Sequence, residues 1–239
     1  MNSIDAEFDS CVEVTIPDYP GTLFWYPKAG LYVRDRGDVG IIREQEHDYG
    51  VMSQFSYPED ALLLDLGGHL GDSAWFFLKK LKKLARVLSV EADPRNAALY
   101  RLNWKYDPRC ELVEAAVVTG DRKWVSLFLG KTYSGDNSLE GYRGRVSVPV
   151  RTVSFQNLLE KDPALIKCDI EGGEFLLDWS GLPASVTEVV MELHQNRLEW
   201  IEKARALDQT LLDQGFYHVQ APKHEELFLH RQIAVWSRR

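Results

Sequence analysis

Short apolar runs alternate with longer stretches of helical apolar spacing from Ala61 onward, and this alternation constrains the fold more than any other feature of the chain. It is typical of βαβ units, in which helices connect the strands of a parallel sheet. The apolar runs that predict strands are 61–66, 86–90, 111–118, 165–168 and 188–193. Helical spacing occurs at 73–84, 94–105, 171–178 and 196–213. Two further runs, 216–220 and 227–237, are joined by a turn short enough to require antiparallel pairing, so we expect an α/β fold with seven strands and an antiparallel last strand.

The first sixty residues differ from the rest in their sequence pattern and in their charge. Short β-type pieces at 12–16, 22–26 and 31–34 are separated by prolines and glycines. Residues 1–60 hold twelve acidic and four basic side chains, so this region accounts for the net charge of −8 of the whole chain. We expect a small β-rich extension over residues 1–60 and a core domain over residues 61–239. The aromatic side chains of the extension suggest a lid over the carboxyl edge of the sheet, and a packing layer or a subunit contact is the alternative.

Composition and cysteine spacing favour a globular protein over a membrane-spanning or disulfide-rich one. With 45% hydrophobic and 27% charged residues, the chain has the composition of a globular domain. No uncharged apolar run approaches the roughly 18 residues of a membrane span, and the start of the chain lacks the pattern of a standard signal peptide. Cys11, Cys110 and Cys168 lie far apart, which favours neither a disulfide framework nor a zinc cluster. We therefore expect a cytoplasmic protein without a membrane span.

The predicted strand 61–66 ends in a glycine-rich turn that opens a helix. In a doubly wound sheet such a turn lies at the carboxyl edge, where backbone N–H groups gather around a ligand. Leu66 stands where the NAD fingerprint has its first glycine, which disfavours NAD. The turn instead reads D-x-G-x-x-x-G, and its carboxylate suits the cationic arm of S-adenosylmethionine better than a pyrophosphate. The expected cofactor contacts are Asp65, Gly67, Gly68, His69, Gly71 and Ser73, and an ordinary βα turn is the alternative.

A second carboxylate follows at the end of the next predicted strand. Glu91 comes twenty residues after Gly71, and at this edge it can accept hydrogen bonds from both ribose hydroxyls of a cofactor. Asp93 precedes Pro94 and is better explained as a helix N-cap. We also expect Ala116, in the third predicted strand, to contact the cofactor.

Acidic side chains follow the predicted strand 165–168. Strands 1 and 4 are neighbours in the usual doubly wound order, so Asp169 should face the glycine turn across the crevice. Glu171 and Glu174 have a structural alternative, because acidic side chains favour the N-terminal end of a helix. The predicted strand 188–193 brings Glu192 and His194 to the same edge.

The candidates for the catalytic base are Asp169, Glu171 and His194, since each can accept a proton at this edge. A metal site would need Asp169 together with Glu171 or Glu192. No histidine-rich or paired-aspartate pattern supports such a site, so no metal is expected.

Four segments together resemble the FkbM family of S-adenosylmethionine-dependent methyltransferases. They are Leu64-Asp65-Leu66-Gly67-Gly68-His69-Leu70-Gly71, Val90-Glu91-Ala92-Asp93-Pro94, Ile166-Lys167-Cys168-Asp169-Ile170-Glu171-Gly172-Gly173-Glu174 and Val190-Met191-Glu192-Leu193-His194. The resemblance implies a class I methyltransferase fold, which is Rossmann-like, with strand order 3-2-1-4-5-7-6. It also implies methyl transfer to a hydroxyl of a sugar or another small polyhydroxylated metabolite. His69 departs from the asparagine common in the family, and Thr152-Val153-Ser154-Phe155 departs from a common Thr-Leu-Asp-Asp.

Two other functions remain open at this point. A nucleic-acid methyltransferase would be supported by a basic run on the first predicted helix, although such runs are more often a solvated face. The run consists of Lys79, Lys80, Lys82, Lys83 and Arg86. A non-catalytic cofactor-binding scaffold is the further alternative, because a fold does not establish a function. The expected acceptor is a small molecule, most readily a carbohydrate, rather than nucleic acid.

Overall fold

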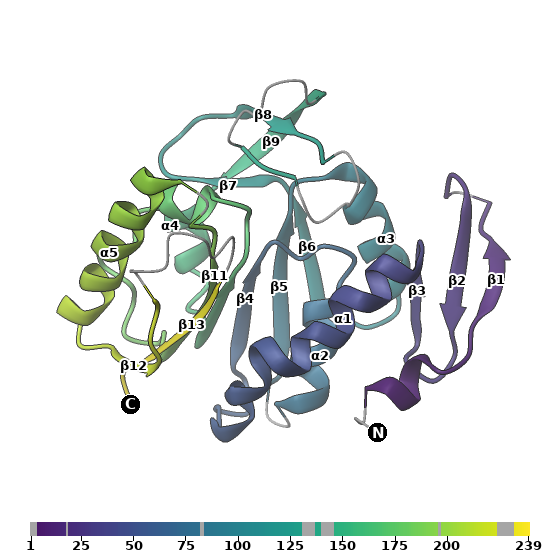
Figure 1. The fold of residues 1–239 in the computed structure, drawn as a ribbon, viewed down its shortest axis with the longest axis horizontal. Helices are drawn as coiled ribbons and strands as arrows, with labels where there is room; N and C mark the ends of the chain where they lie inside the picture. Colours follow the sequence, from purple (N-terminus) through teal and green to yellow (C-terminus); the bar gives the residue numbers. More distant parts are fainter. Residues whose placement is uncertain are drawn as a thin grey trace.

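A seven-stranded sheet forms the centre of the protein in the computed structural model, which describes residues 4–17, 19–81, 84–130, 137–139, 146–195, 197–223 and 232–239. The sheet order is β12-β13-β11-β10-β4-β5-β6 (Figure 1). The bounds are β4 Leu62–Leu66, β5 Arg86–Glu91, β6 Cys110–Glu114, β10 Leu165–Cys168, β11 Glu188–Leu193, β12 Tyr217–Gln220 and β13 Gln232–Ser237. Strand β13 pairs antiparallel with both β11 and β12, whereas the pairs from β11 to β6 are parallel. The expected order 3-2-1-4-5-7-6 and the antiparallel last strand are therefore confirmed.

The sheet is covered on both faces, which explains why its strands read as continuous apolar runs. All five residues of β4 are buried, although one of them is Asp65. Helices α1 (Arg36–Tyr49), α2 (Asp72–Lys80) and α3 (Pro94–Trp104) contribute to the core on one face. Helices α4 (Phe155–Leu159) and α5 (Leu198–Asp213) contribute to the core on the other face. Helix α3 begins as its sequence predicts, because Asp93 accepts a hydrogen bond from the Arg95 N–H and Pro94 occupies the first turn.

The single strand predicted over 111–118 is wrong, because the chain leaves the sheet at Ala115. The Ala115 N–H donates to the Glu91 carbonyl, and the next residues form β7 (Ala116–Val118) in a separate sheet. That sheet has the order β7-β9-β8, with β8 at Trp124–Phe128 and β9 at Ser147–Ser154. Since β7 follows directly from the end of β6, this second sheet lies past the carboxyl edge of the first (Figure 1).

The helix predicted over 171–178 is also wrong. Only the short 3₁₀ helix η3 (Gly173–Leu176) forms there. It is preceded by Gly172 with φ of +92°, in a place where a Cβ atom would lie 2.4 Å from the Trp200 ring. The left-handed backbone at this glycine prevents a regular helix from starting at residue 171.

The N-terminal region contains the expected antiparallel strands β1 (Val12–Thr15), β2 (Thr22–Tyr26) and β3 (Leu31–Val33). It also contains the short 3₁₀ helices η1 (Asp5–Phe8) and η2 (Gly50–Gln54) and the fourteen-residue helix α1, which the reading of residues 12–57 as β-type pieces missed. The side chain of Asp35 caps α1 by accepting from the N–H groups of Gly37 and Asp38. The apolar residues Val39, Ile42 and Tyr49 lie on its buried face.

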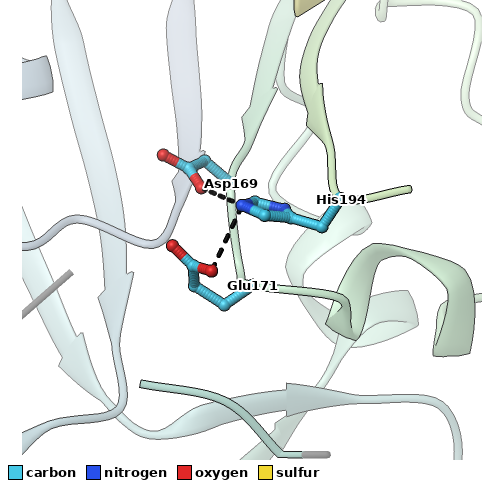
Figure 2. Close-up of side chains that lie close together, drawn as sticks. All are labelled: Asp169, Glu171 and His194. Atoms are coloured by element: carbon cyan, nitrogen blue, oxygen red, sulfur yellow. Dashed lines mark ion pairs between the residues drawn. The ribbon is translucent and has the colours of Figure 1, made fainter. Parts of the chain in front are cut away.

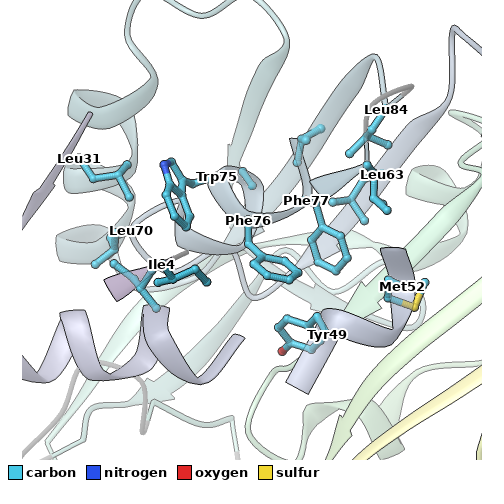
Figure 3. Packing of buried hydrophobic residues seen from close by; sticks show 14 of the residues in the cluster. Ile4, Leu31, Tyr49, Met52, Leu63, Leu70, Trp75, Phe76, Phe77 and Leu84 are labelled. Carbon is cyan, nitrogen blue, oxygen red and sulfur yellow. The ribbon is translucent and has the colours of Figure 1, made fainter. Parts of the chain in front are cut away.

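The N-terminal region packs against α2 and α3 (Figure 3). Tyr49 of α1 stacks on Phe77 of α2 with ring centroids 5.5 Å apart, and Met52 and Ile4 belong to the same buried cluster. The Trp75 indole N–H donates to the Ala29 carbonyl at 2.8 Å. The cluster continues to Leu63 in the central sheet, so the N-terminal region and the sheet share one hydrophobic core. No helix in the described parts of the chain is both long and apolar enough to span a membrane.

Candidate active site

Several strands of the central sheet end at one level and bring the predicted site residues to one edge. Cys168 of β10 pairs with Leu66 of β4, and Leu66 pairs with Val90 of β5. Cys168 also pairs with Met191 of β11. Glu91, the last residue of β5, and the residues Gly67, Asp169 and His194, which come after their strands, therefore lie along the same carboxyl edge.

The glycine turn has little room for side chains. Gly67 has φ of +86°, and a Cβ atom there would lie 1.8 Å from the Asp169 carbonyl oxygen. Gly71 has φ of +91°, and a Cβ atom there would lie 2.1 Å from the Trp104 indole nitrogen. Gly67 and Gly68 donate their N–H groups to the Val90 carbonyl at 2.9 and 3.0 Å. The turn is thus bound to β5 on one side and lies against the end of β10 on the other.

Asp65 lies beneath the glycine turn, where it is fully buried. Its Oδ2 accepts hydrogen bonds from the hydroxyls of Ser73 at 2.6 Å and Ser89 at 2.8 Å. Its Oδ1 lies 3.3 Å from Nζ of Lys167, which also donates to the Gly67 carbonyl at 2.7 Å. Burial lowers the pKa of Lys167, but the charges of Asp65 and Asp169 outweigh burial and raise it, so this side chain stays charged. Asp65 therefore links the glycine turn to Ser73 of α2, to Ser89 of β5 and to Lys167 of β10 through buried polar contacts.

Glu91 holds the turn from the end of β5. Its Oε2 accepts the His69 N–H at 2.8 Å, and its Oε1 accepts the Asp93 N–H at 2.8 Å. The Asn96 amide donates to the same Oε1 at 3.4 Å. Burial raises the pKa of the Glu91 carboxyl, while the two backbone N–H groups oppose that shift.

His69 connects the glycine turn to the N-terminal region. Its backbone adopts φ of +48°, and its Nδ1 lies 3.0 Å from Oδ1 of Asp72. Its Nε2 lies 2.9 Å from Nη2 of Arg34, which in turn forms an ion pair with Asp38 at 3.0 Å. Arg34 was not among the site residues predicted from the sequence, because nothing in its local sequence marks it as a partner of a turn 35 residues away.

Asp169, Glu171 and His194, the three candidate bases, come together at the edge beside the turn, and we refer to them as the edge cluster (Figure 2). His194 Nε2 lies 3.2 Å from Oε2 of Glu171 and 4.0 Å from Oδ1 of Asp169. Glu192 contributes a further oxygen at 3.4 Å from the same nitrogen. Burial and the charge of Glu192 raise the pKa of Asp169 to about 8, although Lys167 and His194 oppose the shift.

Glu174 orients His194 from the protein interior. This fully buried carboxylate accepts the His194 backbone N–H at 2.9 Å and lies 3.1 Å from Nδ1 of the ring. Its other oxygen accepts the Gly172 N–H at 2.9 Å. The ring of His194 is therefore held with Nε2 toward Asp169 and Glu171 (Figure 2).

Two predicted features lie apart from this edge cluster. Ala116 is the first residue of β7 and is buried with Leu127 and Val150 in the core of the second sheet. In the basic run, Lys79 pairs with Glu7 and Lys80 pairs with Glu46 at 2.6 Å. Lys82 and Lys83 lie outside the described residues.

Comparisons with known proteins agree with the sequence motifs. A sequence model of the methyltransferase FkbM domain matches residues 65–217. Among solved structures, an FkbM methyltransferase from Methylobacillus flagellatus KT aligns with 13% identity and a TM-score of 0.47, over 77% of this chain and 44% of that one. The chain therefore spans less than half the length of that structure.

Two other solved structures align with the chain at similarly low sequence identities and TM-scores. Fibrillarin from Aeropyrum pernix, solved with natively bound S-adenosyl-L-methionine, aligns with 11% identity and a TM-score of 0.44, over 95% of this chain and 99% of that one. TrmK from M. capricolum, solved with S-adenosyl-homocysteine, aligns with 6% identity and a TM-score of 0.42, over 81% and 68%. No curated protein sequence matches the chain.

Proposed function

The chain belongs to the FkbM methyltransferase family, and on that basis we propose that it transfers a methyl group to a hydroxyl of a sugar or another small polyhydroxylated metabolite. Its cofactor is S-adenosylmethionine, which supplies an electrophilic methyl group with a good leaving group. The proposal rests on one observation: the side chains of Asp169, Glu171 and His194 lie close together beside the glycine turn.

The donor set at the carboxyl edge fits such a cofactor. Glu91 receives hydrogen bonds from two backbone N–H groups and one amide, and a carboxylate can accept about four. It therefore retains capacity for a ribose hydroxyl. Asp169 is partly exposed, with 27% of its side chain accessible, and a cationic ligand beside Gly67 would favour the charged form of this carboxyl, whose pKa is raised to about 8 without a ligand. Glu91 would hold the ribose and Asp169 would face the charged end of the cofactor.

Methylation of a hydroxyl depends on these residues for proton removal. An alcohol has a high pKa, so the protein must accept its proton as the new bond to carbon forms. The edge cluster provides carboxylate and imidazole groups for this purpose within one small volume. Glu174 fixes the orientation of His194, which favours a defined position for the acceptor hydroxyl.

The charge at the edge favours an uncharged acceptor. Asp169, Glu171, Glu174 and Glu192 all surround His194, and a phosphate group brought there would be repelled. Hydroxyl groups instead find acceptors in these carboxylates. The lysines Lys79 and Lys80 form ion pairs within the chain, which weakens their case as a nucleic-acid surface.

One observation supports RNA as a second candidate acceptor. A pocket of about 580 Å³ on the β7-β9-β8 sheet is lined by Arg122, Lys123, Trp124 and Arg151, among others. Trp124 is 55% exposed, and the Arg151 guanidinium lies 5.6 Å from its ring centroid. Cationic side chains beside an exposed aromatic ring are the usual means of holding single-stranded RNA.

We propose a substrate-facing role for residues 1–60 as well, with residues 61–239 as the methyltransferase core. Arg34 reaches the glycine turn through His69, which gives the extension a contact with the cofactor site. A lid role for its aromatic residues remains a prediction that acceptor kinetics can test.

The test of the proposed function is mass spectrometry of reactions that contain the purified protein and methyl-labelled S-adenosylmethionine. One set of reactions contains monosaccharides, sugar nucleotides and polyols, and the other contains unmodified RNA. We expect label in the carbohydrate set at an oxygen atom. Label in RNA alone would replace the proposal by its alternative, and label in neither set with cofactor bound would support a non-catalytic scaffold.

A further inference from the structure

We propose that Asp169, Glu171 and His194 form a binding site for a divalent cation, with Mn²⁺ as the best match to their chemistry. One oxygen from each carboxylate and one nitrogen of the imidazole lie within 4.8 Å of one another. Ligand atoms this close can contact one ion placed between them, because metal–ligand bonds to such atoms are about 2.0 to 2.6 Å long. The side chains in Figure 2 converge from the end of β10 and the end of β11.

The orientation of His194 is that of a metal ligand with its supporting carboxylate. Nδ1 lies 3.1 Å from the buried Glu174, so this nitrogen carries the ring proton that the carboxylate accepts. Nε2 is then left toward Asp169 and Glu171 as the coordinating atom. Metal-bound histidines almost always donate the N–H of the far ring nitrogen to a carboxylate, a backbone carbonyl or a water, and Glu174 is such a partner for His194.

The carboxylates around His194 outnumber the one imidazole that they surround, so negative charge remains at this edge even when His194 is protonated. Carboxylates of Glu171 and Glu192 lie 3.2 and 3.4 Å from Nε2, with Asp169 at 4.0 Å. Among the described residues, the nearby cation is Lys167, and it lies closer to Asp65 and the Gly67 carbonyl than to Asp169. A cation between Nε2 and the carboxylates would balance the excess of negative charge.

A separate observation at the same strand end points to a polar ligand. Gln195 follows His194 directly and is only 2% exposed. Neither the amide oxygen nor the amide nitrogen of its side chain has a hydrogen-bond partner within the described chain. Buried amides are almost always paired with protein, ordered water or a ligand. A hydrated cation beside His194 would bring ordered water to this strand end.

The ligand types select among divalent ions. Two carboxylates with one imidazole suit Mn²⁺, whereas Ca²⁺ favours oxygen ligands alone and structural Zn²⁺ favours cysteine and histidine. The side chains of Asp169 and Glu171 are 27% and 30% exposed, so the ion would keep positions open toward the crevice. These positions can hold water or an acceptor oxygen.

A role for the ion in turnover rests on the proposed function. An acceptor hydroxyl bound to the cation would have a lowered pKa, as metal-bound water does. Its O–H bond breaks, the proton passes to solvent or to the free oxygen of a ligand carboxylate, and the alkoxide electron pair forms the new bond to the methyl carbon. The methyl carbon leaves the cofactor sulfur in the same step, and that sulfur keeps the electron pair as a thioether.

The competing explanation is a protonated His194 that pairs with the carboxylates and binds no metal. The two explanations differ in a measurable way, because an imidazolium has no lone pair for a metal at Nε2. Binding of Mn²⁺ to the purified chain, measured by electron paramagnetic resonance and calorimetry without cofactor or acceptor, separates them. We expect one saturable site, with Mg²⁺, Ca²⁺ and Zn²⁺ as competitors that reveal its preference.

The variants for this experiment are Glu171→Gln and, as matched control, Glu199→Gln. Glu171 is partly exposed, so its amide variant should fold, and its melting temperature verifies this. Glu199 lies on α5 with 65% of its side chain exposed. We expect Glu171→Gln to weaken Mn²⁺ binding roughly tenfold or more and Glu199→Gln to leave it unchanged. Absence of saturable binding at millimolar Mn²⁺, or equal binding by folded Glu171→Gln, would overturn the site.

Failure of the proposed function gives a different pattern. If Mn²⁺ binds and Glu171→Gln weakens it, while no carbohydrate is methylated, the site stands and the acceptor class is wrong. If carbohydrate is methylated equally with and without a chelator, and Mn²⁺ does not bind, the function stands and the metal site is wrong.

Discussion

Nη2 of Arg34 lies 2.9 Å from Nε2 of His69, and this contact joins the N-terminal region to the turn that should hold the cofactor. Arginine is always protonated and can only donate, so Nε2 of His69 accepts and the ring proton lies on Nδ1 toward Asp72. Asp38 fixes the guanidinium with two hydrogen bonds to Nε and Nη2.

The contact predicts that Arg34→Ala weakens cofactor binding. Loss of the hydrogen bond should release the turn at a cost of about 1 to 2 kcal/mol, which corresponds to roughly a 5- to 30-fold higher Kd. Calorimetry with S-adenosylhomocysteine measures the effect, and Arg36→Ala, which alters an exposed arginine two residues further along the chain, is the control. If a folded Arg34→Ala variant binds S-adenosylhomocysteine with the same affinity as the unmodified chain, the contact has no part in cofactor binding.

Glu91→Ala should reduce affinity for S-adenosylmethionine more strongly. The variant removes the predicted ribose acceptor and also leaves the N–H groups of His69 and Asp93 without their partner. A lost hydrogen bond to a charged group costs about 1.5 to 3 kcal/mol, or roughly 10- to 100-fold in Kd. Glu114→Ala, at the end of β6, is the control, and NAD should bind neither variant nor the unmodified chain. An affinity within about twofold of the unmodified chain would remove Glu91 from the ribose site.

Asp169→Asn should abolish turnover while cofactor still binds. The substitution keeps the shape of the side chain and removes its ionisable carboxyl group, so the proposed proton acceptor and the proposed metal ligand are lost at once. General base catalysis alone accounts for about 10²- to 10⁴-fold in rate. Single-turnover kinetics at saturating cofactor provide the measurement. Unchanged turnover would exclude Asp169 from the chemistry of the site.

Alanine substitutions at Trp25, Tyr26 and Tyr32 test the lid. Tyr26 is buried against Phe8 with ring centroids 5.1 Å apart, so its loss should lower stability by about 3 to 5 kcal/mol. The rings of Trp25 and Tyr32 are tilted by 38° with centroids 4.4 Å apart, and both side chains are only partly buried. A lid requires that one folded variant of these two raises the acceptor KM without changing cofactor affinity. Melting temperature losses alone would leave only a packing role.

Alkylation with iodoacetamide should distinguish the three cysteines. Burial raises the pKa of the Cys110 thiol to about 12, and the nearby charge of Asp107 adds to this shift. At pH 8 this group is therefore a thiol and not the reactive thiolate, and its alkylation should accelerate only as the pH approaches 12. Cys168 is fully buried, and burial also raises its pKa. We expect one modified residue, the exposed Cys11, by mass spectrometry of native protein and three after denaturation.

The central sheet could be predicted because its strands are buried on both faces. Runs such as Leu62–Leu66 and Glu188–Leu193 are apolar almost throughout, and short turns or helical stretches separate them. Helix α1 was less visible, since it is largely polar and contains Gly37 and Gly40. The spacing of Val39 and Ile42 and the capping residue Asp35 were its available signals.

The sequence could predict which residues lie at the carboxyl edge of the sheet, but not how their side chains are oriented there. The order of the strands placed Asp169, Glu171 and His194 at one edge, but it could not show how the side chains face one another. The contact between Glu174 and Nδ1 of His194 joins residues 20 apart in the chain, and the contact of Arg34 with His69 joins residues 35 apart. The backbone is also left-handed at His69, with φ of +48°, and at Glu171, with φ of +54°, a conformation that the types of these residues do not predict.

The glycine turn and the end of β10 behave as one rigid body. A Cβ atom on Gly67 would overlap the Asp169 carbonyl, and the Asp169 N–H donates to the Leu66 carbonyl at 3.0 Å. Lys167 of β10 also contacts the turn, because its Nζ lies beside Asp65 and donates to the Gly67 carbonyl. Movement of the turn would therefore carry Asp169 with it, so we expect the turn and Asp169 to keep their relative positions while cofactor exchanges. If Asp169 takes part in proton removal as proposed, that arrangement stays assembled between one turnover and the next.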